Sequence, residues 1–140
     1  MKTRGFIIIM VAVTLSFAPQ FVNTSSAAGV YSAQLLSPTA GQVLHPGQIV
    51  RVQWKSVLPT IRYMDTCEME VFLSLDGGRT FNIIISPWLD PKAQYFYWTV
   101  PNTPTTQAVL DIRFGCEQFY PETYAPQPAS MFTIAATSGQ

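Results

Sequence analysis

Residues 68–85 read EMEVFLSLDGGRTFNIII, and this stretch gives the clearest indication of the fold class. Apolar and polar side chains alternate over residues 68–75, which is the period of a strand with one buried face. The tripeptide Asp76-Gly77-Gly78 follows, and it is typical of a tight hairpin turn because Gly tolerates positive φ. Apolar residues then recur at every second position over residues 81–85. The stretch therefore predicts a β-hairpin.

Several segments outside this hairpin also follow a strand-like pattern, namely residues 34–36, 48–54, 95–100, 107–114 and 131–135. Pro and Gly separate them, and Pro ends a strand because it lacks the N–H that a ladder needs. No window of 11 residues shows the period of an amphipathic helix. About seven short strands predict an all-β fold, an immunoglobulin-like antiparallel β-sandwich.

The alternation also predicts which side chains face the core. Trp54 lies at the end of one apolar row and is expected in the core. In the segment that ends at Phe114, we expect Ile112 and Phe114 to point inward. Asp111 and Arg113, at the intervening positions, are expected to point outward.

Residues 1–28 have the three parts of a secretory signal peptide. A positive start precedes the mostly apolar residues 6–17, and small residues lead to a cleavage site expected after Ala28. A membrane anchor is the alternative, but a span needs about 20 apolar residues and this run is shorter. We therefore expect a secreted or periplasmic protein with a single immunoglobulin-like domain over residues 29–140 and no stable membrane insertion after cleavage.

The chain contains two cysteines, Cys67 and Cys116. Cys67 precedes the strand-like residues 68–75 and Cys116 follows residues 107–114, and these strands are antiparallel neighbours in the expected sandwich. Because their ends meet, an exported protein with an even number of cysteines is expected to form a disulfide here. Two free thiols are the alternative, and a redox role is not expected because there is no Cys-x-x-Cys pair.

Composition and charge argue against several kinds of function. Eight basic and eight acidic side chains leave no positive excess for a nucleic-acid partner. One His and two Cys are too few for a zinc or iron–sulfur site, and no cofactor is expected. His45 lies in a predicted turn, and Glu68 and Glu70 have the spacing of a solvated strand face, so we expect no enzymatic activity.

Three long loops, residues 56–66, 86–94 and 117–128, are expected at one end of the sandwich. Large aromatic side chains in such loops are typical of binding surfaces. We predict a binding site formed by Tyr63, Trp88, Phe119, Tyr120 and Tyr124. The alternative is that these side chains pack on one another as a small local core. Tyr95 and Tyr97, on the expected outer face of a strand, are a second candidate surface.

The order of several turn and core motifs resembles a known family. These motifs are Ser37-Pro38, Pro46-Gly47, Val52-x-Trp54, Asp76-Gly77-Gly78, residues 97–101 (YWTVP) and residues 110–113 (LDIR). Together they are similar to the immunoglobulin-like, fibronectin type III-like module of the Ser/Thr-rich, GPI-anchored fungal cell-wall family, and to similar modules of bacterial secreted proteins. The resemblance implies a β-sandwich, a location outside the cytoplasm and a structural or binding role.

Residues 74–81, SLDGGRTF, also resemble the Asp-box motif, which is repeated in sialidases and related propellers. In that motif the Asp side chain caps its own turn and an aromatic residue packs beneath it. A single copy indicates a hairpin and gives no reason to expect glycosidase chemistry. Asp76 is therefore expected to form the turn, with a Ca²⁺ site at this isolated carboxylate as the alternative.

These observations predict a secreted, non-catalytic protein that binds a protein or a glycan at the cell envelope. The alternative is a structural subunit of an extracellular or surface assembly. An assembly role predicts a large species in size-exclusion chromatography.

Overall fold

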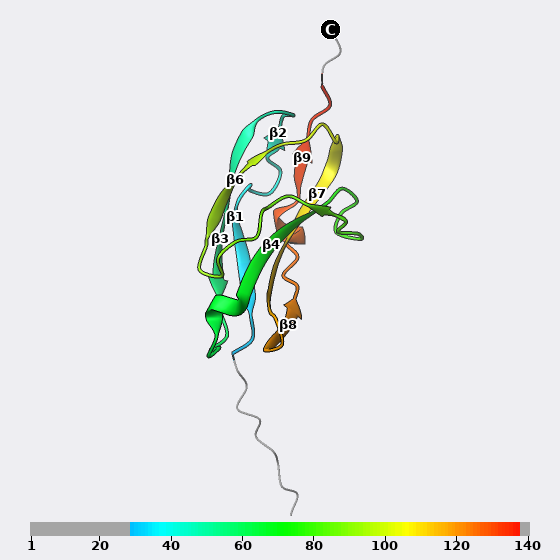
Figure 1. The fold of residues 1–140 in the computed structure, drawn as a ribbon. Helices are drawn as coiled ribbons and strands as arrows, with labels where there is room; N and C mark the ends of the chain where they lie inside the picture. The colour runs from blue at the N-terminus through cyan, green and yellow to red at the C-terminus, as the bar shows by residue number, and fades with distance from the viewer. Residues whose placement is uncertain (1–28, 138–140) are drawn as a thin grey trace, which may run out of the picture.

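A computed structural model describes residues 29–137 and shows two β-sheets packed face to face (Figure 1). The smaller sheet has three antiparallel strands in the order β1 (Ser32–Ser37), β3 (Ile49–Val57) and β6 (Tyr95–Thr99). The larger, six-stranded sheet has the order β2 (Val43–Leu44), β9 (Phe132–Ile134), β7 (Thr105–Cys116), β4 (Cys67–Ser74) and β5 (Ile83–Ile84), with β8 (Tyr120–Thr123) also paired to β7. Two short 3₁₀ helices, η1 (Met64–Thr66) and η2 (Pro128–Ser130), lie in the connections.

The predicted all-β sandwich is confirmed, but the described residues form nine strands rather than about seven. The alternating pattern missed β2 and β8. Strand β2 is only two residues long, which is too short to show a period. Its pairing with β9 is the one parallel strand pairing among the described residues. Strand β8 contains Pro121, which cannot donate to a ladder, so its sequence is typical of a loop. The predicted signal peptide, residues 1–28, lies outside the described residues.

The core lies between the two sheets and is built from the alternating residues of the long strands. On β4 and β7, Val71 is paired with Ile112 and both are fully buried. Trp54 is fully buried, as predicted, and meets Phe96 edge to face with ring centroids 6.2 Å apart. Burying one such aliphatic or aromatic side chain contributes about 1.5–3 kcal/mol, so these rows hold the sheets together.

The predicted disulfide between Cys67 and Cys116 is confirmed, with an S–S distance of 2.00 Å. The two cysteines are paired across the β4–β7 ladder, at the start of β4 and the end of β7. The bond therefore joins the connection that contains η1 to the turn that leads into β8. Disulfides persist in oxidising compartments, so this bond favours a location outside the cytoplasm.

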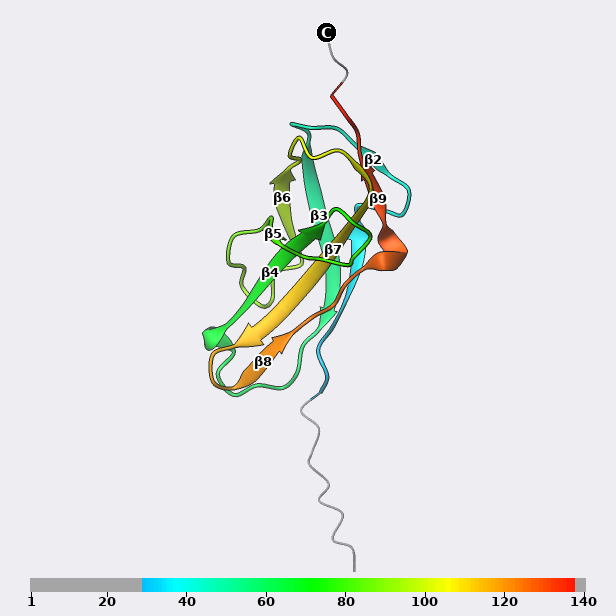
Figure 2. The same ribbon diagram turned by 90° about the vertical axis from the view of Figure 1, so that its right-hand side faces the viewer.

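The prediction of a long loop over residues 117–128 is wrong. The chain turns directly after Cys116, with Gln118 at φ 65°, and returns along β7 as β8. In this pairing Cys116 lies opposite Tyr120 and Phe114 lies opposite Thr123. Figure 2 shows β7 between its neighbours β4 and β8. The segment forms a strand because pairing to β7 satisfies those N–H and C=O groups of β8 that face β7, which a loop would leave to water.

Asp111 lies beside Arg113 on the outer face of β7, as predicted, but it is not exposed to solvent, since the residue is only 1% exposed. The chain that follows β8 crosses beside Asp111, and the backbone N–H of Ala125 donates to its Oδ1 at 2.8 Å. Arg113 Nε donates to the other carboxylate oxygen, Oδ2, at 2.7 Å. Asp111 is thus an internal tie between β7 and the returning chain, because both of its oxygens have protein partners.

Tyr31 links the N-terminal segment to β7. Its buried hydroxyl donates to the Ile112 carbonyl at 3.0 Å, and its ring stacks on Phe114 with centroids 5.1 Å apart. Burial, with a smaller contribution from the negative charge of Asp111, raises the pKa of the Tyr31 hydroxyl well above its usual value near 10. The folded protein therefore favours the neutral form of this side chain.

Replacing Tyr31 with Phe is expected to lower the free energy of unfolding by about 1 kcal/mol at neutral pH, because one buried hydrogen bond is lost. The stabilisation by Tyr31 is complete below pH 10 and is lost above it, since the unfolded phenol ionises before the folded one. Urea titrations from neutral to alkaline pH should show a smaller alkaline loss of stability for Tyr31→Phe than for the wild type. Tyr97→Phe, at an exposed position, is the control and should follow the wild-type curve; a Tyr31→Phe curve parallel to the wild type would contradict the assignment.

Candidate functional site

A hollow of about 600 Å³ lies on the outer face of the larger sheet, beside the disulfide. Its lining residues come from η1, from strands β4, β7 and β8, from the turn between β7 and β8, and from the segment before β6. They are Thr66, Glu68, Glu70, Trp88, Arg113, Phe114, Gly115, Cys116, Glu117, Tyr120, Pro121 and Glu122. Gly115 allows β8 to come close to β7 beside the hollow, because a Cβ at that position would lie 3.2 Å from the Glu122 Cα.

The hollow is acidic. Four of its lining residues, Glu68, Glu70, Glu117 and Glu122, carry carboxylates, and its one basic residue is Arg113. Arg113 is already bound, since its Nε lies 2.7 Å from Asp111 Oδ2 and its Nη1 lies 3.4 Å from Glu122 Oε1. The remaining negative charge favours a neutral or cationic ligand and disfavours an anionic one.

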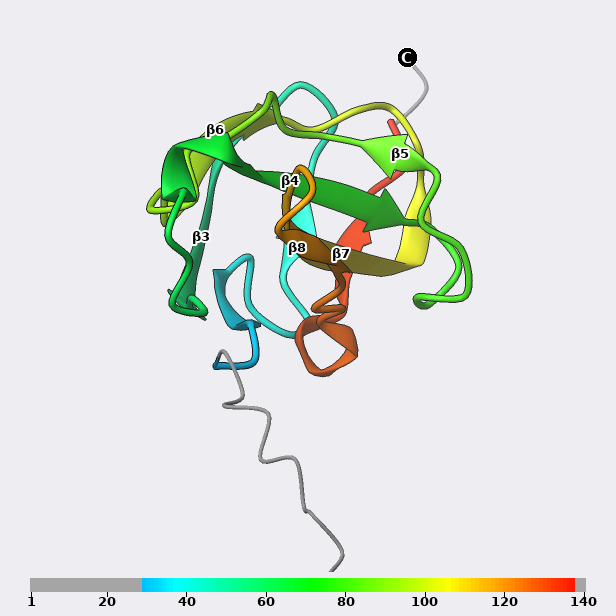
Figure 3. The same cartoon turned by 60° about the horizontal axis from the view of Figure 1, so that its bottom comes forward.

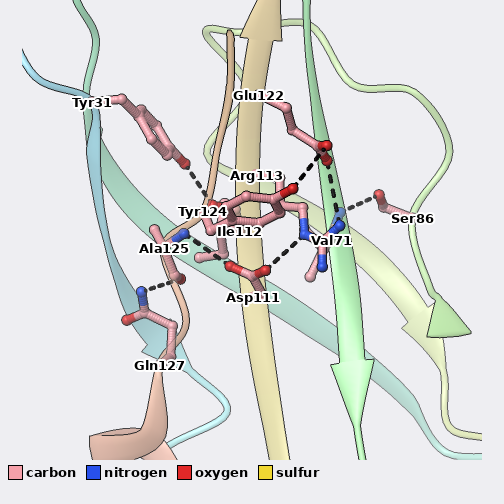
Figure 4. Close-up of polar contacts among 10 residues, drawn as sticks. All are labelled: Tyr31, Val71, Ser86, Asp111, Ile112, Arg113, Glu122, Tyr124, Ala125 and Gln127. Carbon is pink, nitrogen blue, oxygen red and sulfur yellow. Dashed lines mark hydrogen bonds and ion pairs between the residues drawn. The ribbon is translucent and has the colours of Figure 1, made fainter. Parts of the chain in front are cut away.

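Arg113 is held in place by aromatic rings as well as by carboxylates, and Figure 4 shows Tyr124, Asp111 and Glu122 around it. Its guanidinium carbon lies 3.7 Å from the ring centroid of Phe72 and 4.5 Å from that of Tyr124. The Tyr124 hydroxyl lies 3.4 Å from Glu122 Oε2, at the weak end of the hydrogen-bond range. Tyr124 is therefore exposed on one side but packed on Arg113 on the other, and it does not line the hollow.

Trp88 lies between this hollow and a second one of about 440 Å³, and it lines both of them. Its side chain is 78% exposed. The chain on either side of Trp88 is tied to the edge of β4: Ser86 Oγ accepts from the Val71 N–H at 2.8 Å, and Leu89 and Met69 exchange two backbone hydrogen bonds of 3.0 Å. The indole therefore stands on a short arch that is anchored at both ends.

The structure does not bring the five predicted aromatic residues into one cluster. Trp88 and Tyr120 line the same hollow. Tyr120 is also structural, since its ring packs on Phe114 at 5.5 Å and its hydroxyl accepts from the Tyr31 N–H at 3.1 Å. Tyr63 and Phe119 contact each other, with centroids 5.1 Å apart, and both remain exposed.

The carboxylates of the hollow are the part of the site that the sequence did not reveal as a group. Glu68 and Glu70 were expected on the outer face of their strand, and they lie there. Glu117 and Glu122 were assigned to a loop, so their position next to this strand face was not foreseen. The signal that could have located Glu122 is the alternation of β8, which Pro121 obscures.

The Asp-box residues form the expected turn. Asp76 Oδ1 accepts from the Ser74 hydroxyl at 2.6 Å and from the backbone N–H groups of Arg79 and Thr80 at 3.1 and 3.0 Å, and Oδ2 accepts from the Thr80 hydroxyl at 2.8 Å. These hydrogen bonds, that of Ser74 first, hold the pKa of the Asp76 carboxyl well below its usual value. Both carboxylate oxygens of Asp76 therefore accept hydrogen bonds from residues of its own turn.

His45 is exposed in the connection between β2 and β3. Figure 1 shows this connection at the opposite end of the sandwich from the start of β4. Within residues 29–137, no group of three or more His, Cys, Asp or Glu side chains could hold a metal ion. No helix in the same residues has the length and apolar character to cross a membrane.

The fold and the site define a disulfide-bonded β-sandwich with an acidic hollow and an exposed indole on one sheet. No family model matches the chain, and a search of curated proteins found no relative.

Proposed function

We propose that this protein is a secreted, non-catalytic binding module whose partner docks on the acidic hollow and covers Trp88. The observation that carries the proposal is an indole 78% exposed on an arch that is anchored at both ends. Trp is the residue most often found at the energetic centre of interfaces, because it covers a large area at a low cost in conformational entropy. The backbone on either side of Trp88 is already held by β4, so ordering this segment adds little to the entropy cost of binding.

The charge of the hollow narrows the choice of partner. The four carboxylates around Arg113 favour a neutral glycan or a basic protein segment at the cell envelope. A sugar ring would stack on the indole and donate hydrogen bonds from its hydroxyls to the carboxylates of the hollow, whereas a basic segment would form ion pairs with them. The salt dependence of binding separates these partners, because ion pairs at an exposed site weaken as salt is added.

The resemblance of the turn and core motifs to the immunoglobulin-like module of cell-wall proteins agrees with this role. That family is extracytoplasmic, and the Cys67–Cys116 disulfide favours the same kind of compartment. We infer an envelope location for the partner from these two observations together.

Replacing Trp88 with Ala is expected to weaken binding by about 30-fold, which corresponds to the roughly 2 kcal/mol lost at an interface hot spot. The melting temperature should stay near the wild-type value, because the side chain is mostly exposed in the free protein. A glycan array and a titration against proteins of an envelope extract measure the effect. Ile49→Ala, at an exposed apolar position on the other sheet, is the matched control. Equal binding by Trp88→Ala and wild-type protein would overturn the proposal.

A further inference from the structure

Strand β6 forms one edge of the smaller sheet, and within residues 29–137 its single partner strand is β3. Figure 3 looks toward the end of the sandwich that carries β8 and shows β6 at the border of its sheet, beyond β3. An edge strand presents one row of backbone N–H and C=O groups that the sheet does not use.

The hydrogen bonds at the two ends of β6 identify which groups are free. The Val100 N–H donates to the Gln48 carbonyl at 2.9 Å, and the Gln94 carbonyl accepts from the Trp54 N–H at 2.9 Å. In an antiparallel ladder every second residue faces the same neighbour, so the even-numbered residues of β6 face β3. The backbone groups of Tyr95, Tyr97 and Thr99 therefore point away from the sheet.

Two other strand edges of the sandwich, those of β1 and β4, are protected. On β1, the Gln127 side chain occupies the free edge: its Nε2 donates to the Ala33 carbonyl and its Oε1 accepts from the Leu35 N–H, both at 2.9 Å. On β4, the edge is covered by β5 and by the Leu89 backbone. Strand β6 reads YFYWT and has neither a charged residue nor Pro, the two features that usually keep an edge from pairing.

The free edge of β6 is self-complementary. A two-fold axis through Tyr97 places Tyr97 opposite its own copy and Tyr95 opposite Thr99 of the second copy. All three residues then exchange backbone hydrogen bonds in pairs, as directly opposed residues of an antiparallel ladder do. Their side chains share the outer face, where Tyr95 and Tyr97 are exposed and 6.0 Å apart edge to face.

The charges around the edge fit a second copy of this chain. Strand β6 itself is uncharged, so self-pairing brings no like charges into contact. The cation Arg51 is one strand away on β3, and its guanidinium carbon lies 4.1 Å from the Tyr95 ring centroid. In the paired sheet, β6 and its copy lie between the two β3 strands, so Arg51 and its copy are three strand spacings apart, about 14 Å. This distance exceeds the screening length in physiological salt, so repulsion between the two cations is weak.

We propose that β6 pairs in antiparallel orientation with β6 of a second copy, which joins two three-stranded sheets into one continuous sheet. The contact is of the strand-addition type, in which main-chain hydrogen bonds supply much of the affinity. It does not depend on the function proposed for Trp88, since that residue belongs to the other side of the sandwich. The dimer would present two acidic hollows, which strengthens binding to a repeated partner.

Sedimentation velocity of the exported protein over a micromolar range tests the proposal, and the expected result is a concentration-dependent dimer. Tyr97→Lys places two cations opposite each other on the axis and should weaken dimerisation at least about tenfold. Ile49→Lys, at an equally exposed apolar position on β3, is the matched control and should dimerise as the wild type does. A wild-type protein that stays monomeric, or a dimer that Tyr97→Lys leaves intact, overturns the proposal.

Amide hydrogen exchange provides a second measurement that needs no variant. The N–H groups of Tyr95, Tyr97 and Thr99 should exchange more slowly as protein concentration rises, while those of β5 should not change. If the three amides exchange at the same rate at all concentrations although a dimer forms, the dimer uses another surface and the proposal is wrong.

Discussion

Replacing Asp111 with Ala is expected to lower the free energy of unfolding by about 3–5 kcal/mol, the usual cost of removing one partner of a buried ion pair. Asp111 is 1% exposed and Arg113 is mostly covered, so the guanidinium would lose the carboxylate that lies 2.7 Å from its Nε. The Ala125 N–H would lose its acceptor as well. Both losses occur where water cannot fully replace the missing oxygen, which is why the effect is large.

Urea denaturation at neutral pH measures this change. Glu122→Gln is the matched control, because Glu122 also pairs with Arg113 but is about half exposed, and it should change stability by less than about 1 kcal/mol. If Asp111→Ala and Glu122→Gln have equal effects, the Asp111 side chain is not the tie that the structure indicates.

Removing the disulfide with the pair Cys67→Ser and Cys116→Ser is expected to lower the free energy of unfolding by about 4 kcal/mol. The bond closes a loop of 49 residues, and in the chain-entropy model its loss returns that much conformational freedom to the unfolded chain. The folded sheets keep their pairing, so the variant should retain the β-sheet circular-dichroism spectrum at low temperature and melt earlier.

The wild-type protein in reductant is the control for this variant. Its stability should fall to that of the double variant, while reductant should not affect the variant itself. A wild-type protein whose stability is unchanged by complete reduction would contradict the expected contribution. Because Cys116 lines the acidic hollow, binding measured on the folded double variant would also show whether the hollow keeps its shape without the bond.

The two proposed surfaces have different physical origins. The acidic hollow exists because β8 returns along β7 next to Gly115 and because the arch of Trp88 is tied to β4. The edge of β6 is available because it lacks the side-chain cap that Gln127 provides for β1. A variant in one surface should therefore leave the geometry of the other unaffected, and binding of a monovalent ligand tests the hollow independently of the dimer.

Local patterns were sufficient for the strands, the hairpin and the disulfide. Alternation along β4 and β7 identifies the buried rows because successive side chains of a strand point to opposite faces. The Asp76 turn is also predictable, since its hydrogen-bond partners lie within four residues of it. The pairing of Cys67 and Cys116 follows once their strands are placed as antiparallel neighbours.

Long-range contacts determined the rest. Asp111 is buried because Ala125, 14 residues further along the chain, returns beside it, and no pattern around Asp111 contains that information. Residues 120–123 form a strand because β7 offers them a free edge, although Pro121 makes their own sequence typical of a loop. The alternation of a strand defines two faces, but which other segments cover the outer face depends on where distant parts of the chain come to lie.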